Sequence, residues 1–153
     1  MANPEHVKES WADLESVADR LRHALKDFAK GNPQPTKEFF SRRDDVTLAN
    51  PFGPAVQGWD SVSKALEFAA SRFRDGDVSR IDTIASYVSA DLATFHETEH
   101  WQARVGEGEN VASFTLRVTS TFRREEGKWR LVHRHADPIA SHDPNGPMRS
   151  SLA

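Results

Sequence analysis

A strict two-residue alternation between positions 111 and 123 constrains the fold of this 153-residue chain more than any other feature. One set of alternate residues is mainly apolar, and the other is polar: Ala112, Phe114, Leu116, Val118, Ser120 and Phe122 against Ser113, Thr115, Arg117, Thr119, Thr121 and Arg123. Successive side chains of a strand point to opposite faces of the pleated backbone. The alternation therefore predicts a long β-strand with one face toward a core.

Similar segments surround this strand and suggest a run of hairpins. We expect further strands at residues 78–88, 92–105 and 129–135, with turns at 90–91 and 106–110 between the earlier ones. Residues 125–128, Glu-Glu-Gly-Lys, predict the last hairpin turn, because glycine suits the backbone of such turns. The second half of the chain is thus predicted to form four antiparallel strands.

The first half of the chain has helical periodicity instead. Apolar residues recur at spacings of three and four at Val7, Trp11, Leu14, Ala18, Leu21, Leu25 and Phe28. This stripe predicts one long helix, opened by Asn3-Pro4-Glu5 and ended by Gly31-Asn32-Pro33.

Shorter elements are expected between the long helix and the hairpins. We predict a second helix at residues 37–42 capped by Thr36, and a brief strand at residues 46–49. A third helix should begin at residues 58–60 and stop at Gly76. Its inward positions are Val62, Leu66, Ala69, Ala70 and Phe73.

This order of elements is typical of an α+β domain, with helices packed on one face of an antiparallel sheet. The length is most simply one domain. We place its limits at residues 1–138, and we expect residues 139–153, which include two prolines and no apolar stripe, to form a tail.

Composition argues against several classes of function. A net charge of −3, with dispersed basic residues, gives no electrostatic basis for binding nucleic acid or an anionic membrane. No apolar run approaches the roughly 20 residues of a membrane helix. The chain has no cysteine, which fits a reducing compartment. With no sign of a signal peptide at the N-terminus, we expect a cytoplasmic protein.

The segment FHETEHW, residues 95–101, contains the H-E-x-x-H pattern of zinc proteases. That pattern needs a helix, whereas the alternation around it predicts a strand. On a strand, His96 and His100 lie about 13 Å apart and cannot share one zinc ion. A weaker possibility is a metal site at His133 and His135 with Asp137 or His96. We favour hydrogen-bonded sheet histidines and predict neither a metal nor a cofactor.

Residues 116–138, LRVTSTFRREEGKWRLVHRHADP, resemble the SnoaL-like, ketosteroid-isomerase-like branch of the nuclear-transport-factor-2-like superfamily. Residues 46–66 and 91–101 fall where that family would place them. The resemblance implies a cone: a curved sheet wrapped around a pocket that the long helix closes. It also implies a homodimer formed through the outer face of the sheet, to which the threonine-rich positions 115, 119 and 121 are suited.

Two functions are compatible with the resemblance. The first is a pocket for a small molecule, with isomerase, cyclase or dehydratase acid–base chemistry on an apolar carbonyl compound. The second is a non-catalytic dimeric binding or assembly module with a vestigial cavity. An open apolar pocket with a carboxylate facing it favours the first, and a filled cavity with a locked carboxylate favours the second.

The candidate site centres on the strand at residues 92–105. Glu97 and Glu99 share a face with two aromatic residues, and apolar surroundings can turn a carboxyl group into a general acid or base. Glu99 falls where many relatives carry an acidic residue, so it is the candidate catalytic group. Its alternative role is a structural pair with an arginine on an adjacent strand. The expected ligand-binding residues are Asn50, Phe52, Trp59, Glu97, Trp101, Phe114, Val118 and Arg134.

The sequence departs from characterised relatives in two ways. Steroid isomerases of this fold carry a tyrosine in the first helix, where this chain has Trp11 and Leu14. The association domain of calcium/calmodulin-dependent kinase lines its pocket with arginines, where this chain has Glu99, Ser120 and Ala136. The oxyanion donor of the first is therefore missing or supplied by another group, and the anion site of the second is not expected. Asn50 has an equally good alternative role as a turn residue before proline.

Overall fold

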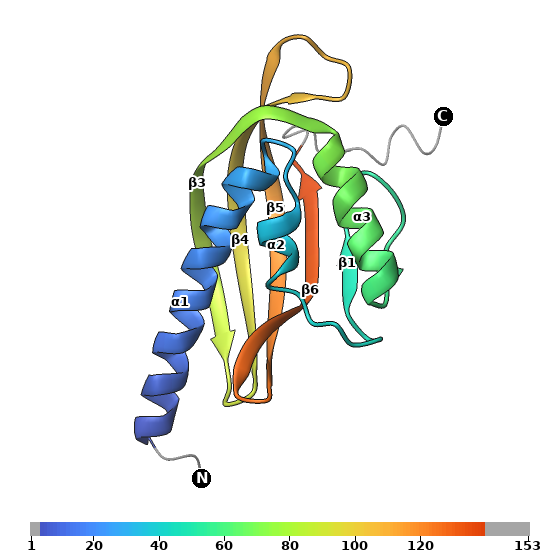
Figure 1. Ribbon diagram of the computed structural model, residues 1–153. Helices are drawn as coiled ribbons and strands as arrows, with labels where there is room; N and C mark the ends of the chain where they lie inside the picture. Colours follow the sequence, from blue (N-terminus) through green and yellow to red (C-terminus); the bar gives the residue numbers. More distant parts are fainter. Residues whose placement is uncertain (1–3, 140–153) are drawn as a thin grey trace, which may run out of the picture.

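In the part of the chain described by this computed structural model, residues 4–139, three helices lie on one face of a six-stranded sheet (Figure 1). For residues 4–10 only the backbone is described. The elements are α1 (Pro4–Phe28), α2 (Gln34–Lys37), β1 (Thr47–Ala49), β2 (Val56–Gln57), α3 (Trp59–Ser71), β3 (Phe73–Val88), β4 (Leu92–Val105), β5 (Val111–Glu125) and β6 (Lys128–Pro138).

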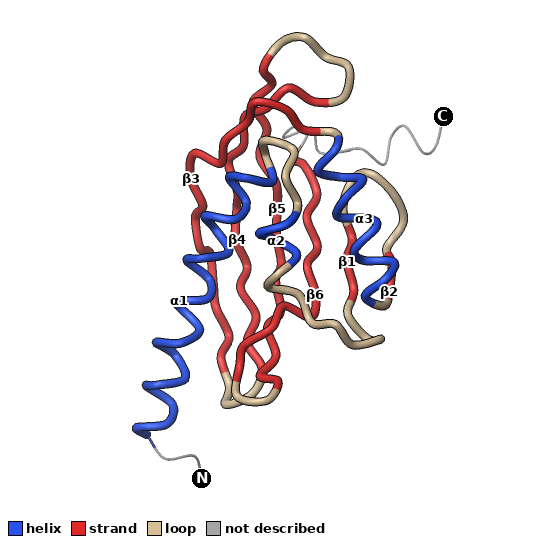
Figure 2. Tube along the Cα trace, viewed as in Figure 1, coloured by secondary structure: helices blue, strands red, loops and turns tan. Residues whose placement is uncertain are grey.

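The strands follow the order β2-β1-β6-β5-β4-β3, and the sheet is curved and unclosed (Figure 2). Strands β3 to β6 form antiparallel hairpins, whereas β1 runs parallel to β6. The predicted α+β architecture and the four long strands are confirmed, and β4 has the expected bounds. The two-residue strand β2 was not expected from the sequence, because so short a segment has no period to detect.

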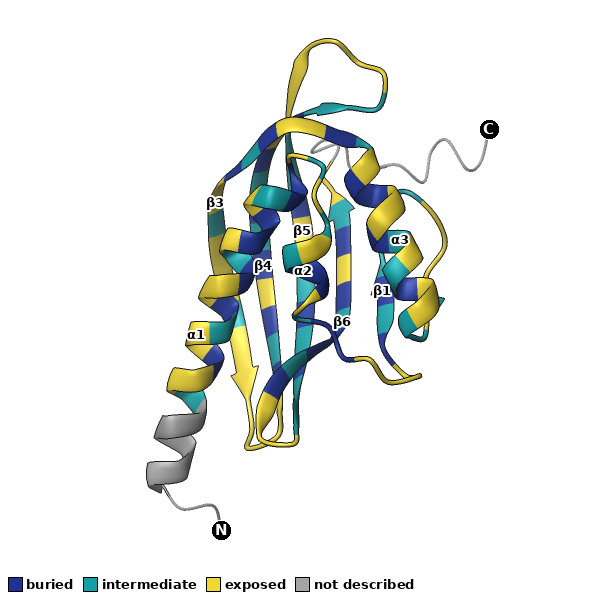
Figure 3. Ribbon diagram, viewed as in Figure 1, coloured by how far each residue is buried: buried dark blue, intermediate teal, exposed yellow. Residues whose placement is uncertain are grey.

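The core lies between the helices and the inner face of the sheet (Figure 3). On β5, Leu116, Val118 and Phe122 are buried, while Arg117 on the other face is exposed. The described part of the α1 stripe is also buried from Leu14 to Phe28, as the helical spacing predicts. The two-residue alternation of β5 and the helical spacing of α1 therefore identify correctly the face of each element that packs in the core.

The two short helical predictions need correction. Helix α2 spans Gln34–Lys37, so the helix predicted at residues 37–42 is wrong beyond Lys37, where Phe40 instead forms a bridge with Leu131. Thr36 lies inside α2 and does not cap it. The proline in its first turn, whose fixed φ suits that position, starts the helix earlier than expected. Helix α3 ends at Ser71, and Phe73 begins β3 by pairing with Val105. This long-range pairing overrides the local helical pattern that extended to Gly76.

A β-bulge in β6 determines which of its residues face the core. Phe122 pairs with Leu131 and Thr121 pairs with His133, so Val132 is an extra residue on the β6 side. An extra residue reverses the alternation of the strand. Trp129 and Leu131 are buried before the bulge, whereas Arg134 and Ala136 are buried after it. The bulge thus turns His133 and His135 to the outer face.

Gly76 is expected to be intolerant of any side chain. A Cβ atom there would lie 2.5 Å from the Ala29 carbonyl oxygen and 2.7 Å from the Gln102 carbonyl oxygen. Because backbone atoms cannot rotate away, Gly76→Ala should destabilise the protein by about 1–3 kcal/mol. Gly53→Ala is the matched control, since a Cβ atom at Gly53 has no neighbour within 4 Å. Urea unfolding measures both, and equal midpoints for the two variants would contradict this packing.

Two expectations lie outside the described residues: the Asn3 cap and residues 140–153 of the C-terminal tail. Ile139 is described, and its N–H donates to the Thr115 carbonyl at 2.9 Å. None of the described helices combines the length and the apolar character that crossing a membrane requires.

Candidate functional site

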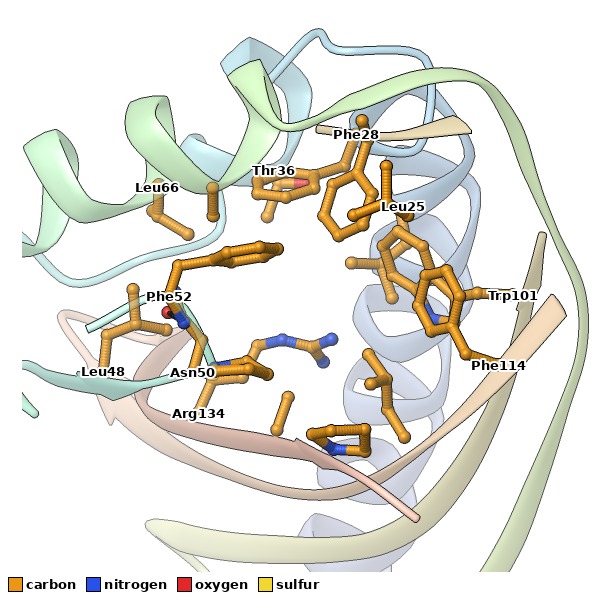
Figure 4. Close-up of a pocket in the computed structure, with 17 residues that line it drawn as sticks. Leu25, Phe28, Thr36, Leu48, Asn50, Phe52, Leu66, Trp101, Phe114 and Arg134 are labelled. Carbon is orange, nitrogen blue, oxygen red and sulfur yellow. Dashed lines mark hydrogen bonds between the residues drawn. The ribbon is translucent and has the colours of Figure 1, made fainter. Parts of the chain in front are cut away.

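A cavity of about 180 Å³ lies between the inner face of the sheet and the three helices (Figure 4). Most of its lining side chains are apolar; the exceptions are Thr36, Asn50 and Arg134. The apolar ones are Leu25, Phe28, Leu48, Pro51, Phe52, Leu66, Ala69, Phe73, Trp101, Val105, Phe114, Leu116, Ala136 and Pro138. The cavity is therefore an apolar chamber with three polar positions in its wall.

Aromatic rings make up one side of this chamber. The ring of Phe73 lies 5.3 Å from Trp101, 5.9 Å from Phe114 and 5.5 Å from Phe52, measured between centroids. Such offset and edge-to-face contacts hold the rings in fixed orientations. Phe73 connects the wall because it touches rings from β4, β5 and the loop after β1.

A buried ion pair lies beside this aromatic wall, with Arg134 entering the chamber from the sheet side (Figure 4). Arg134 on β6 reaches across β5 to Glu99 on β4, donating from both terminal nitrogens at 2.7 and 2.9 Å. Trp101 Nε1 donates to the same carboxylate at 3.0 Å. Arg134 is 7% exposed and Glu99 is 1% exposed. The predicted pairing of Glu99 with an arginine is present, but the two strands are separated by β5 and are not adjacent.

Arg134 remains charged although it is buried, because Glu99 stabilises its positive charge. Burial disfavours the charged guanidinium, but the attraction and hydrogen bonds of Glu99 outweigh it and raise the pKa of Arg134. A guanidinium has five N–H donors, and Glu99 takes two of them. Arg134 lines the cavity whereas Glu99 lies behind it. The group presented to the cavity is therefore a hydrogen-bond donor whose charge is already balanced.

Asn50 and Phe52 lie at the cavity wall, as expected from the sequence. Asn50 Oδ1 accepts a hydrogen bond from the Phe52 backbone N–H at 3.0 Å, so Asn50 also fills its alternative role in a turn. Trp101, Phe114 and Arg134 line the cavity as well.

Three expected residues do not line the cavity. Glu97 accepts hydrogen bonds from Arg22 of α1 and Thr83 of β3 at 2.8 and 3.0 Å. Val118 is 1% exposed in the core and lies opposite Glu97 in the pairing of β4 with β5. Trp59 packs near Phe40, with the Arg42 guanidinium 3.6 Å from its ring centroid. These three side chains are therefore not among those that line the cavity.

Several lining residues were not named as site candidates. Leu25, Phe28 and Leu66 belong to the apolar stripes of α1 and α3, which could have indicated them. Thr36 gives no such signal, because its place before residue 37 indicates a helix cap. Phe73 fits the apolar stripe of the predicted third helix, whereas in the structure it begins β3.

The histidine-rich segments do not form the site. His96 and His100 lie in β4, as predicted, so the helix required by the zinc-protease pattern is not formed. His133 Nδ1 lies 2.8 Å from Thr47 Oγ1, and His135 contacts Asp137 through Nε2. Among the described residues, no three metal-binding side chains gather closely enough to hold an ion.

His133 predicts a pH dependence of stability. Burial, followed by the charge of His135, lowers the pKa of His133 below its ordinary 6.5. The unfolded chain then binds a proton more readily than the folded protein, so stability should be full above pH 6.5 and fall as the pH drops toward the lowered pKa. Urea unfolding at pH 7.5 and pH 5.5 tests this. The free energy of unfolding should be lower at pH 5.5, and this difference between the two pH values should be smaller in His133→Gln than in wild type. An unchanged difference in that variant would contradict the assignment.

The sequence matches the SnoaL-like domain over residues 17–141. A comparison with curated proteins gives no significant match.

Solved structures are similar to this fold along most of its length. A nuclear transport factor 2-like superfamily protein from Salmonella enterica has a TM-score of 0.72 and 15% identity, covering 90% of this chain and 96% of that one. A ketosteroid isomerase-like protein from Erwinia carotovora has a TM-score of 0.70 and 17% identity, covering 85% and 96%. A scytalone dehydratase candidate from Novosphingobium aromaticivorans has a TM-score of 0.66 and 16% identity, covering 89% and 88%. At these identities the similarity establishes the fold, which is the expected cone.

Proposed function

The chain belongs to the SnoaL-like domain family, and we propose that its pocket binds a small, largely apolar molecule that carries a carbonyl or hydroxyl group. The observation that carries this proposal is an apolar cavity of about 180 Å³ with Arg134 facing it. Apolar cavities of about 150 Å³ in proteins admit one benzene ring. A few polar groups in an apolar wall orient such ligands.

The ion pair supports an uncharged ligand. Arg134 is the one charged residue among those that line this cavity, and Glu99 balances its charge. An anionic ligand would have to compete with the carboxylate, and a cationic one would meet the guanidinium. A carbonyl or hydroxyl oxygen needs only one of the free N–H donors.

The catalytic form of this proposal is acid–base chemistry of the isomerase, cyclase or dehydratase type on a carbonyl compound. Arg134 would donate to the carbonyl oxygen and stabilise negative charge that develops on it. Glu99 remains the candidate for proton transfer, and it must first release one of its three hydrogen bonds, two from Arg134 and one from Trp101. The isomerase-like and dehydratase names of two relatives are consistent with this class, while their low identity leaves the reaction to be tested.

The second candidate is a non-catalytic dimeric module, and the locked geometry of Glu99 and Arg134 favours it over catalysis. In this form the ion pair is structural. We propose a homodimer in both cases, because none of the helices in residues 4–139 covers the outer face of β4 to β6 (Figure 1). Thr119 lies at the centre of that face, between His96 and His135. Thr119→Glu should lower the mass seen by light scattering if this face joins two copies; an unchanged dimer would place the contact elsewhere.

Cytoplasm is the compartment that we propose, because the chain has no cysteine and no described helix suited to a membrane. Fractionation of cells that express the protein tests this. Recovery in a membrane or secreted fraction would contradict it.

Native mass spectrometry of the protein purified from cells tests the binding proposal. We expect a fraction of the protein to carry an extra mass from a co-purified small molecule. Ala69→Phe should remove this mass because Ala69 lines the cavity and a ring there fills it. Lys64→Phe places the same ring on the exposed side of α3 and is the matched control. Retention of the mass by folded Ala69→Phe protein would place the ligand outside this cavity.

A further inference from the structure

The hydroxyl group of Thr36 has no hydrogen-bond partner in the described part of the protein. Thr36 is 1% exposed, and its Oγ1 atom is one of four buried polar side-chain atoms without a partner there. The others belong to Arg22, Arg104 and Ser120, none of which lines the cavity. Among these four residues, Thr36 is therefore the one that lines the pocket.

A role within the fold does not account for this hydroxyl. It does not cap α2, since Thr36 lies within that helix and the capping position is Pro33. Its backbone carbonyl accepts from the Phe39 N–H at 3.2 Å, which leaves the side chain uninvolved. A buried hydroxyl without a partner is unfavourable to folding, and a valine would fill the same space without that disadvantage.

Thr36 and Arg134 lie on opposite sides of the cavity, with the apolar rings between them (Figure 4). Thr36 projects from the helical side, near Leu66 and Phe28, and Arg134 from the sheet side. A molecule that fills the cavity can therefore meet a polar group at each end and apolar surface along its length.

We propose that Thr36 is a ligand-binding residue whose hydroxyl hydrogen-bonds a second polar atom of the ligand. The ligand class is then an uncharged ring compound with oxygen-containing groups at two ends, one directed to Arg134 and one to Thr36. This inference rests on the proposed function, because it requires that the cavity takes a ligand at all.

A pair of probes with matched shape tests the role of the hydroxyl. Benzene-1,4-diol and 4-methylphenol differ by one hydroxyl in place of a methyl group. Arg134 can bind one hydroxyl of either probe, and only the diol offers a second hydroxyl to Thr36, so NMR titration of each measures the contribution of Thr36. Wild-type protein should prefer benzene-1,4-diol by roughly five- to tenfold. Thr36→Val should reduce this preference to less than about twofold and leave 4-methylphenol affinity unchanged. Thr36→Ser retains the hydroxyl and should retain the preference.

Thermal unfolding separates binding from a structural role. Thr36→Val without ligand should melt at the same or a higher temperature than wild type, because it removes an unpartnered buried hydroxyl. A clear fall in melting temperature would show that the hydroxyl stabilises the fold and would overturn the inference. An equal preference for benzene-1,4-diol over 4-methylphenol in wild type and Thr36→Val would also overturn it, while binding itself stands. Failure of both probes to bind wild type would instead overturn the proposed function.

Discussion

Replacing Glu99 with glutamine is expected to lower the free energy of unfolding by about 3–5 kcal/mol. The substitution keeps the size of the side chain but leaves the charge of Arg134 unpaired at a site that is 7% exposed. An uncompensated buried charge is far more costly than the loss of one hydrogen bond. Urea unfolding followed by circular dichroism measures the change.

The double variant Glu99→Leu with Arg134→Met separates the ion pair from the packing around it. Exchanging both charged partners for apolar residues of similar volume is often neutral or stabilising. We therefore expect the double variant to have a urea midpoint close to that of wild type and well above that of Glu99→Gln alone. If Glu99→Gln itself unfolds like wild type, the pair is not buried as the geometry requires, and the charge balance proposed for the pocket is wrong.

Phe73→Ala is expected to reduce stability by about 3–5 kcal/mol and to enlarge the pocket. The ring of Phe73 packs against Phe28, Phe52, Trp101 and Phe114, so its removal leaves a cavity that these neighbours cannot fill without moving. The new space adjoins the existing chamber because Phe73 lines it. Denaturant unfolding gives the stability loss. NMR titration should show a wider range of bound ring compounds.

Phe122→Ala is the matched control for this prediction. Phe122 is 1% exposed and packs against Phe95, but it does not line the cavity. It should lose a similar amount of stability while the binding of 4-methylphenol stays as in wild type. Equal effects of the two variants on binding would mean that the affinity depends on global stability and not on the chamber wall.

Local alternation was sufficient to predict the four long strands from the sequence, although not the two-residue strand β2 or the start of β3 at Phe73. The strand at residues 92–105 has its expected bounds because both of its ends carry turn residues and its interior alternates without interruption. The same reasoning placed His96 and His100 on a strand and so removed the zinc-protease interpretation. It also brought Glu99, Trp101 and Phe114 to one face, where the structure has them together.

Features that depend on distant contacts could not be predicted in this way. The bulge at Val132 arises from the register with β5, and strict alternation through it would have put Arg134 on the wrong face. Phe73 follows a helical pattern in sequence, yet its pairing with Val105 makes it a strand residue. Thr36 lies at the cavity wall because α2 begins at Gln34, after the capping residue Pro33, which places Thr36 inside the helix and not at its cap.

A titration of the protein with 1,4-dimethylbenzene, followed by NMR, tests the central claim most directly. The account predicts saturable binding, with the largest shifts at residues around the cavity such as Ala69, Trp101 and Ala136. Ala69→Phe should abolish the binding, and Lys64→Phe should not change it. No saturable binding to wild type, or unchanged binding to folded Ala69→Phe protein, would contradict a pocket that takes apolar molecules.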